Sequence, residues 1–235
     1  MAVRINNLHF CWSVGGPVVL NISNLSIEDG AQVLVTGPSG SGKTSLLNIL
    51  SGIAVPDTGE VGILGADMRA MSASARDSFR ADHIGVIFQM FNLIPYLSVT
   101  ENVMLACTFS KMRRDRADKA GGVREQANDL LAALGLAPET FGSRRVDALS
   151  IGQQQRVAAA RALIGNPGLV IADEPTSALD SANRRVFIDL VSGACRDLGA
   201  TLIIVSHDEA LFPFFDNRFD MAQLNSAASV TAHIA

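Results

Sequence analysis

A glycine-rich segment near residue 40 has the composition and spacing of a phosphate-binding loop. It consists of Gly37, Pro38, Ser39, Gly40, Ser41, Gly42, Lys43, Thr44 and Ser45. Glycines here let backbone N–H groups converge on phosphate oxygens, and the helix that follows adds a partial positive charge. Lys43 would bind the β- and γ-phosphates, and the Thr44 hydroxyl could ligate Mg²⁺. The segment predicts binding of a nucleoside triphosphate, because a turn that only capped a helix would not require Lys and then Thr.

Two carboxylates form a second candidate group. Asp173 and Glu174 follow the apolar run 169–172, and the end of such a strand lies at the sheet edge where ligands bind in open parallel sheets. Asp173 could hold Mg²⁺ through water, and Glu174 could accept a proton from an attacking water. An acidic pair alone could simply cap a loop. With a phosphate loop upstream, it supports a nucleotide site.

The elements that must position these groups are visible as periodic patterns. Residues 3–10 and 18–27 alternate apolar and polar side chains and predict antiparallel strands, joined by a Gly-Gly-Pro turn. Short apolar runs predict buried strands at 31–36, 84–88, 169–172 and 201–205, and helical spacing predicts helices at 45–50, 153–164 and 183–198. Residues 98–148 read as mainly helical. The order indicates an α/β fold whose mostly parallel sheet has helices on both faces.

Composition narrows the function classes. The 235 residues carry a net charge of −4 and are 48% hydrophobic, which excludes a disordered chain and shows no basic excess of the kind typical of nucleic-acid binders. The basic run 111–119 is interleaved with aspartates, so we expect a solvated helix face. No apolar stretch is expected to span a membrane, and no signal peptide is expected at the N-terminus.

The spacing of the cysteines and histidines predicts neither a redox motif nor a metal site. Cys11, Cys107 and Cys195 are widely spaced with no CxxC pair, and the four histidines show no metal-ligand spacing. Buried free thiols in a reducing compartment are the expectation.

Two further segments carry a family resemblance. Residues 149–153 read Leu-Ser-Ile-Gly-Gln, and 175–180 read Pro-Thr-Ser-Ala-Leu-Asp directly after the acidic pair. With the phosphate loop, they make the chain resemble the nucleotide-binding subunit of an ATP-binding-cassette (ABC) transporter from the first strands to His207. The resemblance implies a P-loop NTPase core at about 1–95 and 151–235, with an antiparallel N-terminal β subdomain. It also implies an inserted helical subdomain at about 96–150.

The resemblance also implies roles for residues within the nucleotide site. Trp12 would stack on adenine, although a Trp in the core is the alternative. Gln89 would touch Mg²⁺ and sense a membrane partner. His207 would contact the γ-phosphate, beside Lys43 and Glu174.

Other implied roles lie between two subunits. Ser150, Gly152 and Gln153 belong to the signature segment, which would hold the γ-phosphate of a second subunit, and Asp180 would communicate between the two sites. The family usually has Gly where this chain has Ile151. A β-branched residue disfavours positive φ, so we expect ordinary helical or extended backbone there. Ser150 should still cap the following helix.

The implied partners are an integral membrane subunit and a second nucleotide-binding subunit, in a homodimer or a heterodimer, with ATP and Mg²⁺ bound and no nucleic acid. The protein would be cytoplasmic and peripheral on the membrane. Residues 86–103 are similar to subunits for lipoprotein release, macrolide export and cell division, and the segment from Gln89 to Tyr96 is expected to contact the membrane partner.

The resemblance implies an ATPase that hydrolyses ATP and powers a separate membrane subunit in transport through ATP-driven dimerisation. Three alternatives to this function remain open. One is a regulatory, mechanotransmitting ATPase of the cell-division type that moves no solute, another a soluble cassette acting on ribosomes or DNA, and the third a non-hydrolysing binding module. The substrate, the direction of transport and a role for residues 221–235 are not assigned.

Overall fold

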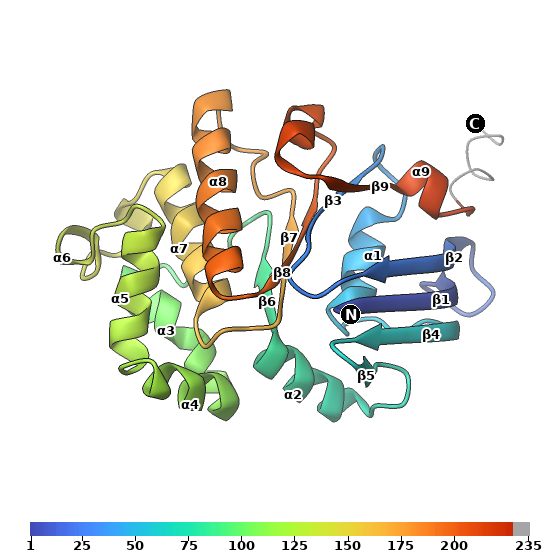
Figure 1. Cartoon of the computed structure of the whole chain (residues 1–235), viewed down its shortest axis with the longest axis horizontal. Coiled ribbons are helices and arrows are strands. Elements are labelled where there is room, and N and C mark those ends of the chain that lie inside the picture. The colour runs from blue at the N-terminus through green and yellow to red at the C-terminus, as the bar shows by residue number, and fades with distance from the viewer. Residues whose placement is uncertain (228–235) are drawn as a thin grey trace.

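The computed structural model describes residues 1–227, which form two sheets and the helices around them (Figure 1). The strands are β1 (Val3–Cys11), β2 (Val18–Ile27), β3 (Gln32–Thr36), β4 (Thr58–Ile63), β5 (Ala66–Asp67), β6 (Ile84–Ile87), β7 (Leu169–Asp173), β8 (Thr201–Val205) and β9 (Asn217–Asp220). The helices are α1 (Lys43–Leu50), α2 (Ala73–His83), α3 (Val99–Phe109), α4 (Lys111–Lys119), α5 (Val123–Ala133), α6 (Pro138–Phe141), α7 (Ile151–Leu163), α8 (Ser181–Asp197) and α9 (Met221–Leu224). Of the C-terminal stretch 221–235, residues 228–235 lie outside the described residues.

The central sheet has the strand order β6-β7-β8-β3-β9, and all of its pairings are parallel. Alternate residues of β7 belong to different clusters: Val170 and Ala172 pack with α7 and α8, whereas Leu169 and Ile171 pack with α1. Both faces of this sheet are therefore covered, as Figure 1 shows. This arrangement confirms the predicted α/β fold, and it explains why the strands read as continuous apolar runs.

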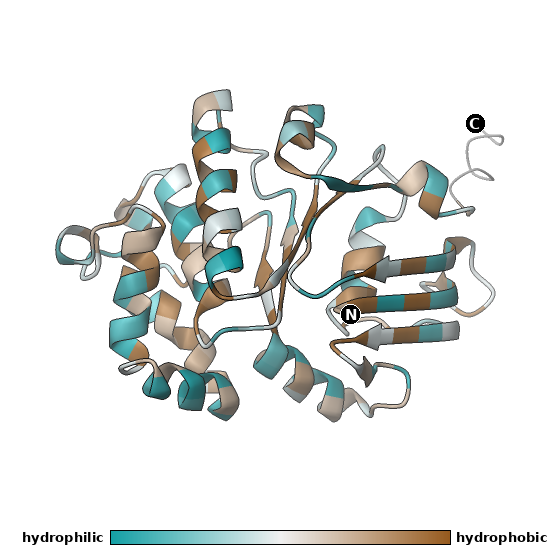
Figure 2. Cartoon of the chain, in the orientation of Figure 1, coloured by the Kyte–Doolittle hydropathy of each residue, from teal (hydrophilic) through white to brown (hydrophobic). Residues whose placement is uncertain are grey.

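A second sheet, with the order β2-β1-β4-β5, is antiparallel and packs on α1 from the other side. β1 and β2 are the antiparallel pair that alternation predicts. Figure 2 shows the alternation as brown and teal bands along these strands, whereas the central strands are largely brown. The two patterns differ because the antiparallel sheet buries one face, whereas the central sheet buries both.

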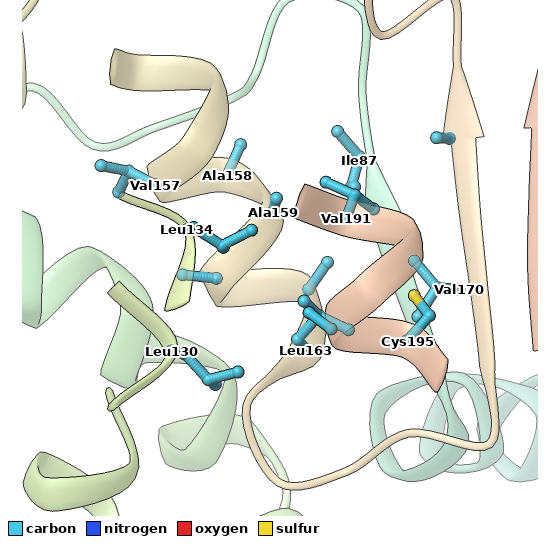
Figure 3. Close-up of a cluster of buried hydrophobic side chains, with 14 of the residues drawn as sticks. Ile87, Leu130, Leu134, Val157, Ala158, Ala159, Leu163, Val170, Val191 and Cys195 are labelled. Carbon is cyan, nitrogen blue, oxygen red and sulfur yellow. The ribbon is translucent and has the colours of Figure 1, made fainter. Parts of the chain in front are cut away.

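Helices α3–α7 lie between β6 and β7 in the chain. Of these, α7 packs against α8 and β6, and α3 and α5 pack against α7 (Figure 3). The alanine run at 158–160 of α7 is fully buried, and its small side chains let neighbouring helices approach closely. Leu130, Leu134 and Leu163 fill the space around it. In the described part of the chain, no helix is both long enough and apolar enough to cross a bilayer.

The expectation of a solvated basic face on α4 is wrong for Arg113. This side chain is only 2% exposed, and its guanidinium donates to the carbonyls of Ile84, Ala162 and Ile164 at 2.6–3.1 Å. Burial lowers its pKa to about 10, so it remains a cation at neutral pH. Arg113 thus ties α4 to β6 and to the end of α7, a long-range contact that charge patterning along one helix does not reveal.

Several elements escape the sequence patterns. β4 carries Gly59 and Gly62 and therefore reads as a loop, α2 buries none of its residues, and β9 is a short, mostly polar edge strand. β4 and β9 form because β1 and β3 supply the strand pairing. α2 begins at its cap, where Ser72 accepts from Ala75 N.

Candidate functional site

The phosphate loop runs from the end of β3 into α1, as predicted. Gly42 stands at the N-cap of α1 with φ = 96°, a conformation that side chains rarely adopt, and a Cβ there would come within 2.7 Å of Leu20 Cδ2. A Cβ on Gly37 would likewise meet Ser41 Oγ at 2.8 Å and Met221 Cβ at 2.9 Å. Both glycines are therefore required by the packing of the loop itself, and the helix N-terminus points into the adjoining cavity.

Lys43 folds back over this loop. Its Nζ donates to the carbonyl oxygens of Gly37 at 2.7 Å and of Pro38 at 2.9 Å. The ammonium is thereby held over the loop on the side that faces the acidic pair, since Lys43 and both carboxylates line one cavity. The lysine is positioned before any anion arrives, which lowers the ordering cost of binding one.

That cavity, of about 460 Å³, collects the predicted groups from four parts of the chain. The phosphate loop lines one side, and residues at the ends of β7 and β8, together with Gln89 after β6, line the rest. β3 and β7 both flank β8 in the parallel sheet, so their carboxyl ends meet at one edge. The residues that line the cavity are Val19, Ser39, Gly40, Gly42, Lys43, Thr44, Ser45, Gln89, Asp173, Glu174 and His207.

Glu174 occupies a strained and tightly held position. Its φ is +44°, which is uncommon outside glycine, and its backbone N–H donates to Val205 O at 2.9 Å. The carboxylate accepts from Ser206 Oγ at 3.1 Å and from the His207 backbone N–H at 3.1 Å, and it lies 2.7 Å from His207 Nδ1. The residue after β7 is thus locked to the end of β8, which turns its carboxylate toward the cavity.

The donor set of the cavity suits a hard divalent cation. Thr44 offers a hydroxyl, Gln89 an amide oxygen and Asp173 a carboxylate, which are the oxygen ligands that Mg²⁺ accepts. Burial raises the pKa of Asp173, and the charge of Glu174 adds to that effect while Lys43 opposes it. Two carboxylates placed this closely are poorly compensated by protein alone. The residues present therefore fit the magnesium ion expected from the sequence.

Trp12 lies in the turn after β1, and it is not a core residue. Its side chain is 59% exposed, with Nε1 donating to Ser45 Oγ at 3.3 Å and its ring edge-on to Phe10 at 4.9 Å. The exposed ring therefore stands beside the phosphate loop without lining the cavity. This position is compatible with the predicted stacking on a base.

The signature segment lies apart from that cavity in the single chain. Ser150 caps α7 by accepting from Gln153 N at 3.3 Å, and Gln153 Oε1 accepts from Ser150 N at 3.0 Å, a complete capping box. Ile151 begins the helix with ordinary φ and is 53% exposed. A Cβ on Gly152 would meet only Leu179, at 3.6 Å. The expectations for the cap and the Ile151 backbone are confirmed, although none of these residues lines the cavity beside the phosphate loop.

Asp180 is also outside the cavity. Its Oδ1 accepts from Asn183 N and its Oδ2 from Asn183 Nδ2, both at 2.8 Å, so it caps α8. These hydrogen bonds lower the pKa of its carboxyl group. The structure therefore brings most of the predicted phosphate-site residues to one cavity, whereas Trp12, Gly37, Pro38 and Ser41 do not line it. Ser150, Gly152, Gln153 and Asp180 also lie outside this cavity.

The sequence analysis did not identify two residues that position the site. Arg161 of α7 donates to the carbonyls of Phe91 and Asn92 at 2.6 Å each, which holds the loop after Gln89 in left-handed backbone at both residues. Asn225, buried just after α9, donates to Ser41 O at 3.0 Å and to Val19 O at 2.9 Å. No pattern in the neighbouring sequence marks either residue, because each one donates hydrogen bonds to a segment far away in the chain.

Comparison with known proteins places these features in a family. Residues 20–177, more than half of the chain, match the family model described as ABC transporter. The chain belongs to the ABC transporter family. Within that family it is an ATP-binding cassette, and the resemblance seen in the sequence is confirmed.

Curated relatives of this cassette match along most of their length. The lipoprotein-releasing system ATP-binding protein LolD of Bacteroides fragilis is 37% identical over 213 residues, covering 91% of this chain and 95% of LolD. The ABC transporter ATP-binding protein YtrE of Bacillus subtilis is 36% identical, covering 87% of this chain and 85% of YtrE.

Solved structures agree. The dimeric cassette MJ0796 of Methanocaldococcus jannaschii, in a post-hydrolysis state with ADP and Pi, is 34% identical with a TM-score of 0.79, and the match covers 96% of this chain and 95% of that one. The cassette cbiO1 of Clostridium perfringens, from the complex cbiONQ, gives a TM-score of 0.82 at 26% identity, covering 98% and 90%.

Proposed function

We propose that this cassette hydrolyses ATP between two nucleotide-binding subunits and passes the resulting motion to an integral membrane subunit, at the cytoplasmic face of the membrane. The observation that carries the proposal is the convergence of Lys43, Thr44, Asp173, Glu174 and His207 on one cavity. A protein that only bound ATP would need the phosphate loop and no acid beside it. The buttressed acid and the histidine beside it are the additional parts that hydrolysis requires.

Each residue of the cavity has a distinct part in this scheme. The loop N–H groups and Lys43 bind the β- and γ-phosphates, and Trp12 stacks on the adenine. Thr44, Asp173 and Gln89 would hold Mg²⁺, which when bound neutralises phosphate charge. Glu174 orients the attacking water and accepts its proton. His207 contacts the γ-phosphate, where its ring is held by the Glu174 carboxylate at 2.7 Å.

The exposed signature segment supports a dimeric mechanism. The N-terminus of α7 and the donors of Ser150 and Gly152 would close over the γ-phosphate bound by another subunit, so that each ATP bridges two chains. Gln153 closes the capping box at the start of that helix, and Asp180, which caps α8, would communicate between the two sites. Binding of ATP then favours the closed dimer, and hydrolysis removes the bridge. The dimeric MJ0796 relative supports this arrangement, while the choice of homodimer or heterodimer is left to experiment.

A groove beside α2 and α3 is the proposed contact for the membrane subunit. It has a volume of about 320 Å³, and its lining includes Phe88, Asn92, Phe109 and Arg161. Phe109 is 75% exposed, and Tyr96 in the adjoining loop is 73% exposed, a costly display for an isolated chain. Phe91 and Leu93 instead pack on the core. Loss of co-purification with the membrane subunit in Tyr96→Glu, but not in Tyr96→Phe, would support the contact.

The catalytic proposal is tested by two substitutions in the purified protein. Lys43→Ala should lower both ATP affinity and turnover, since it removes the cation that faces the phosphates. Glu174→Gln should keep ATP binding, reduce turnover by roughly 10²–10³-fold and accumulate an ATP-bound dimer in light scattering. Unchanged turnover in Glu174→Gln, or an exclusively monomeric variant with ATP, would contradict it.

A further inference from the structure

Strand β1 presents metal-ligating side chains that the nucleotide site does not use. The strand departs from regular geometry at Asn7, which has φ = +50°, and its register with β4 shifts between Asn6 and His9. Beyond this bulge Leu8 and Phe10 are buried, so the intervening His9 and Cys11 share the opposite, partly exposed face. Side chains two residues apart on one strand face can reach a common ligand.

A third ligand comes from the segment that precedes β4. The ligand atoms of His9, Cys11 and Asp57 all lie within 4.8 Å of one another. His9 Nδ1 is 3.8 Å from Asp57 Oδ2. In a tetrahedral zinc site, with bonds of about 2.0–2.3 Å, neighbouring ligand atoms lie roughly 3.4–3.6 Å apart. From separations of at most 4.8 Å, the ligand atoms therefore have to approach one another by up to about 1.4 Å to close on an ion.

Asp57 is held in place by the backbone around it. Its N–H donates to His9 O at 2.9 Å, and its Oδ2 accepts from Cys11 N at 2.8 Å. Arg69 donates to Asp57 O and to Gly59 O, both at 3.0 Å, which fastens the whole turn. The guanidinium is thus occupied with carbonyls of the turn. Ligands fixed in this way require little reorganisation.

We propose that His9, Cys11 and Asp57 form a binding site for a borderline-soft divalent cation such as Zn²⁺, with water as the fourth ligand. A set of imidazole, thiolate and carboxylate selects such ions over Mg²⁺, which prefers oxygen ligands. Binding releases the thiol proton of Cys11 to solvent. Desolvation and the negative charge of Asp57 raise the pKa of that thiol.

The site adjoins the proposed adenine platform. Cys11 directly precedes Trp12, the only tryptophan of the chain, whose Nε1 donates to Ser45 Oγ in the phosphate loop. An ion on Cys11 therefore restrains the backbone that carries this ring. Trp12 emission offers a local readout for metal binding, independent of ATPase activity.

The test is a titration of the untagged, nucleotide-free full chain with Co²⁺, followed by Zn²⁺. We expect a thiolate-to-cobalt absorption band at one equivalent, quenching of Trp12 emission, and loss of the band when Zn²⁺ is added. Cys11→Ser should abolish the band, and His9→Asn or Asp57→Asn should weaken binding at least about tenfold. Metal bound in the nucleotide cavity would give no such band, because none of that cavity's lining residues is a thiol.

Cys107→Ala is the matched control, since it removes a buried thiol elsewhere and should leave the band unchanged. Circular dichroism and ATP-induced changes in Trp12 emission check that each variant is folded. A band that survives in Cys11→Ser, the absence of any thiolate band in the wild type, or affinity unchanged in both His9→Asn and Asp57→Asn would overturn the proposal. If Cys11→Ser does not fold, the latter two variants decide the matter.

Discussion

The phosphate cavity and the signature segment differ in how complete they are within one chain. In the cavity, Lys43 is held by its own loop and Glu174 by the end of β8, so the groups are in place without a partner. At the signature segment, Ser150 is satisfied only by the capping box of α7, and its neighbour Ile151 is exposed. The cavity assembles its groups within one chain, whereas the signature segment of that chain lies outside the cavity. The contrast favours binding by a monomer and hydrolysis by a dimer.

The sharpest test of this contrast is Ser150→Arg. The added bulk and charge should obstruct closure over the partner's nucleotide and lower turnover by roughly 10²–10³-fold, while ATP binding to the monomer stays near its wild-type value. Turnover and Trp12 emission on the same sample separate the two effects. Ser143→Arg places the same charge on an exposed serine elsewhere and should be neutral. Intact turnover in Ser150→Arg would remove the signature segment from the mechanism.

Arg161→Met probes the connection between the regions. Arg161 belongs to the helix that begins at the signature segment, yet its guanidinium holds the loop after Gln89. Releasing that loop should lower turnover about 10–100-fold by displacing Gln89, with ATP affinity nearly unchanged. Steady-state kinetics and calorimetry would show it. Equal losses in affinity and turnover would instead indicate damage to the phosphate cavity.

Trp12→Ala addresses the cavity side alone. Loss of stacking should weaken ATP binding by about tenfold, equivalent to about 1.4 kcal/mol, and should leave turnover at saturating ATP close to wild type. Isothermal calorimetry measures the affinity without relying on the missing fluorophore. Trp12→Phe retains an aromatic face and should recover most of the binding. Affinity unchanged in Trp12→Ala would exclude the proposed adenine contact.

The smallest expected effect is the change in stability of the nucleotide-free and metal-free protein in Asp173→Asn. Burial and Glu174 raise the pKa of the Asp173 carboxyl, so the folded protein bears a cost for its ionised form above that pKa. The variant should therefore melt at a higher temperature than the wild type at neutral pH, without nucleotide or metal. The advantage should shrink as the pH falls through the raised pKa, because the wild-type carboxyl then takes up its proton. Melting curves across this range decide it, and a constant difference would contradict the assignment.

Local sequence was most informative where chemistry and backbone demands coincide. The phosphate loop, the acidic pair after β7 and the cap at Ser150 could all be predicted, because each is encoded by a few adjacent residues with strict conformational requirements. The buried strands could be predicted for the same reason, since burial on both faces leaves a continuous apolar run. β4 could not, because it forms through pairing with β1. α2 could not, because it has no buried face that would leave an apolar pattern.

The sequence by itself predicted a site for a nucleoside triphosphate and most of the side chains that line the cavity. Only the tertiary structure decided how those side chains are held, through Ser206 and His207 on Glu174 and through Asn225 on the phosphate loop. It also decided that Arg113 is buried and that His9 and Cys11 meet Asp57. The physical reason is the same throughout. These contacts join segments far apart in the chain, and their free energy depends on distances that exist only after folding.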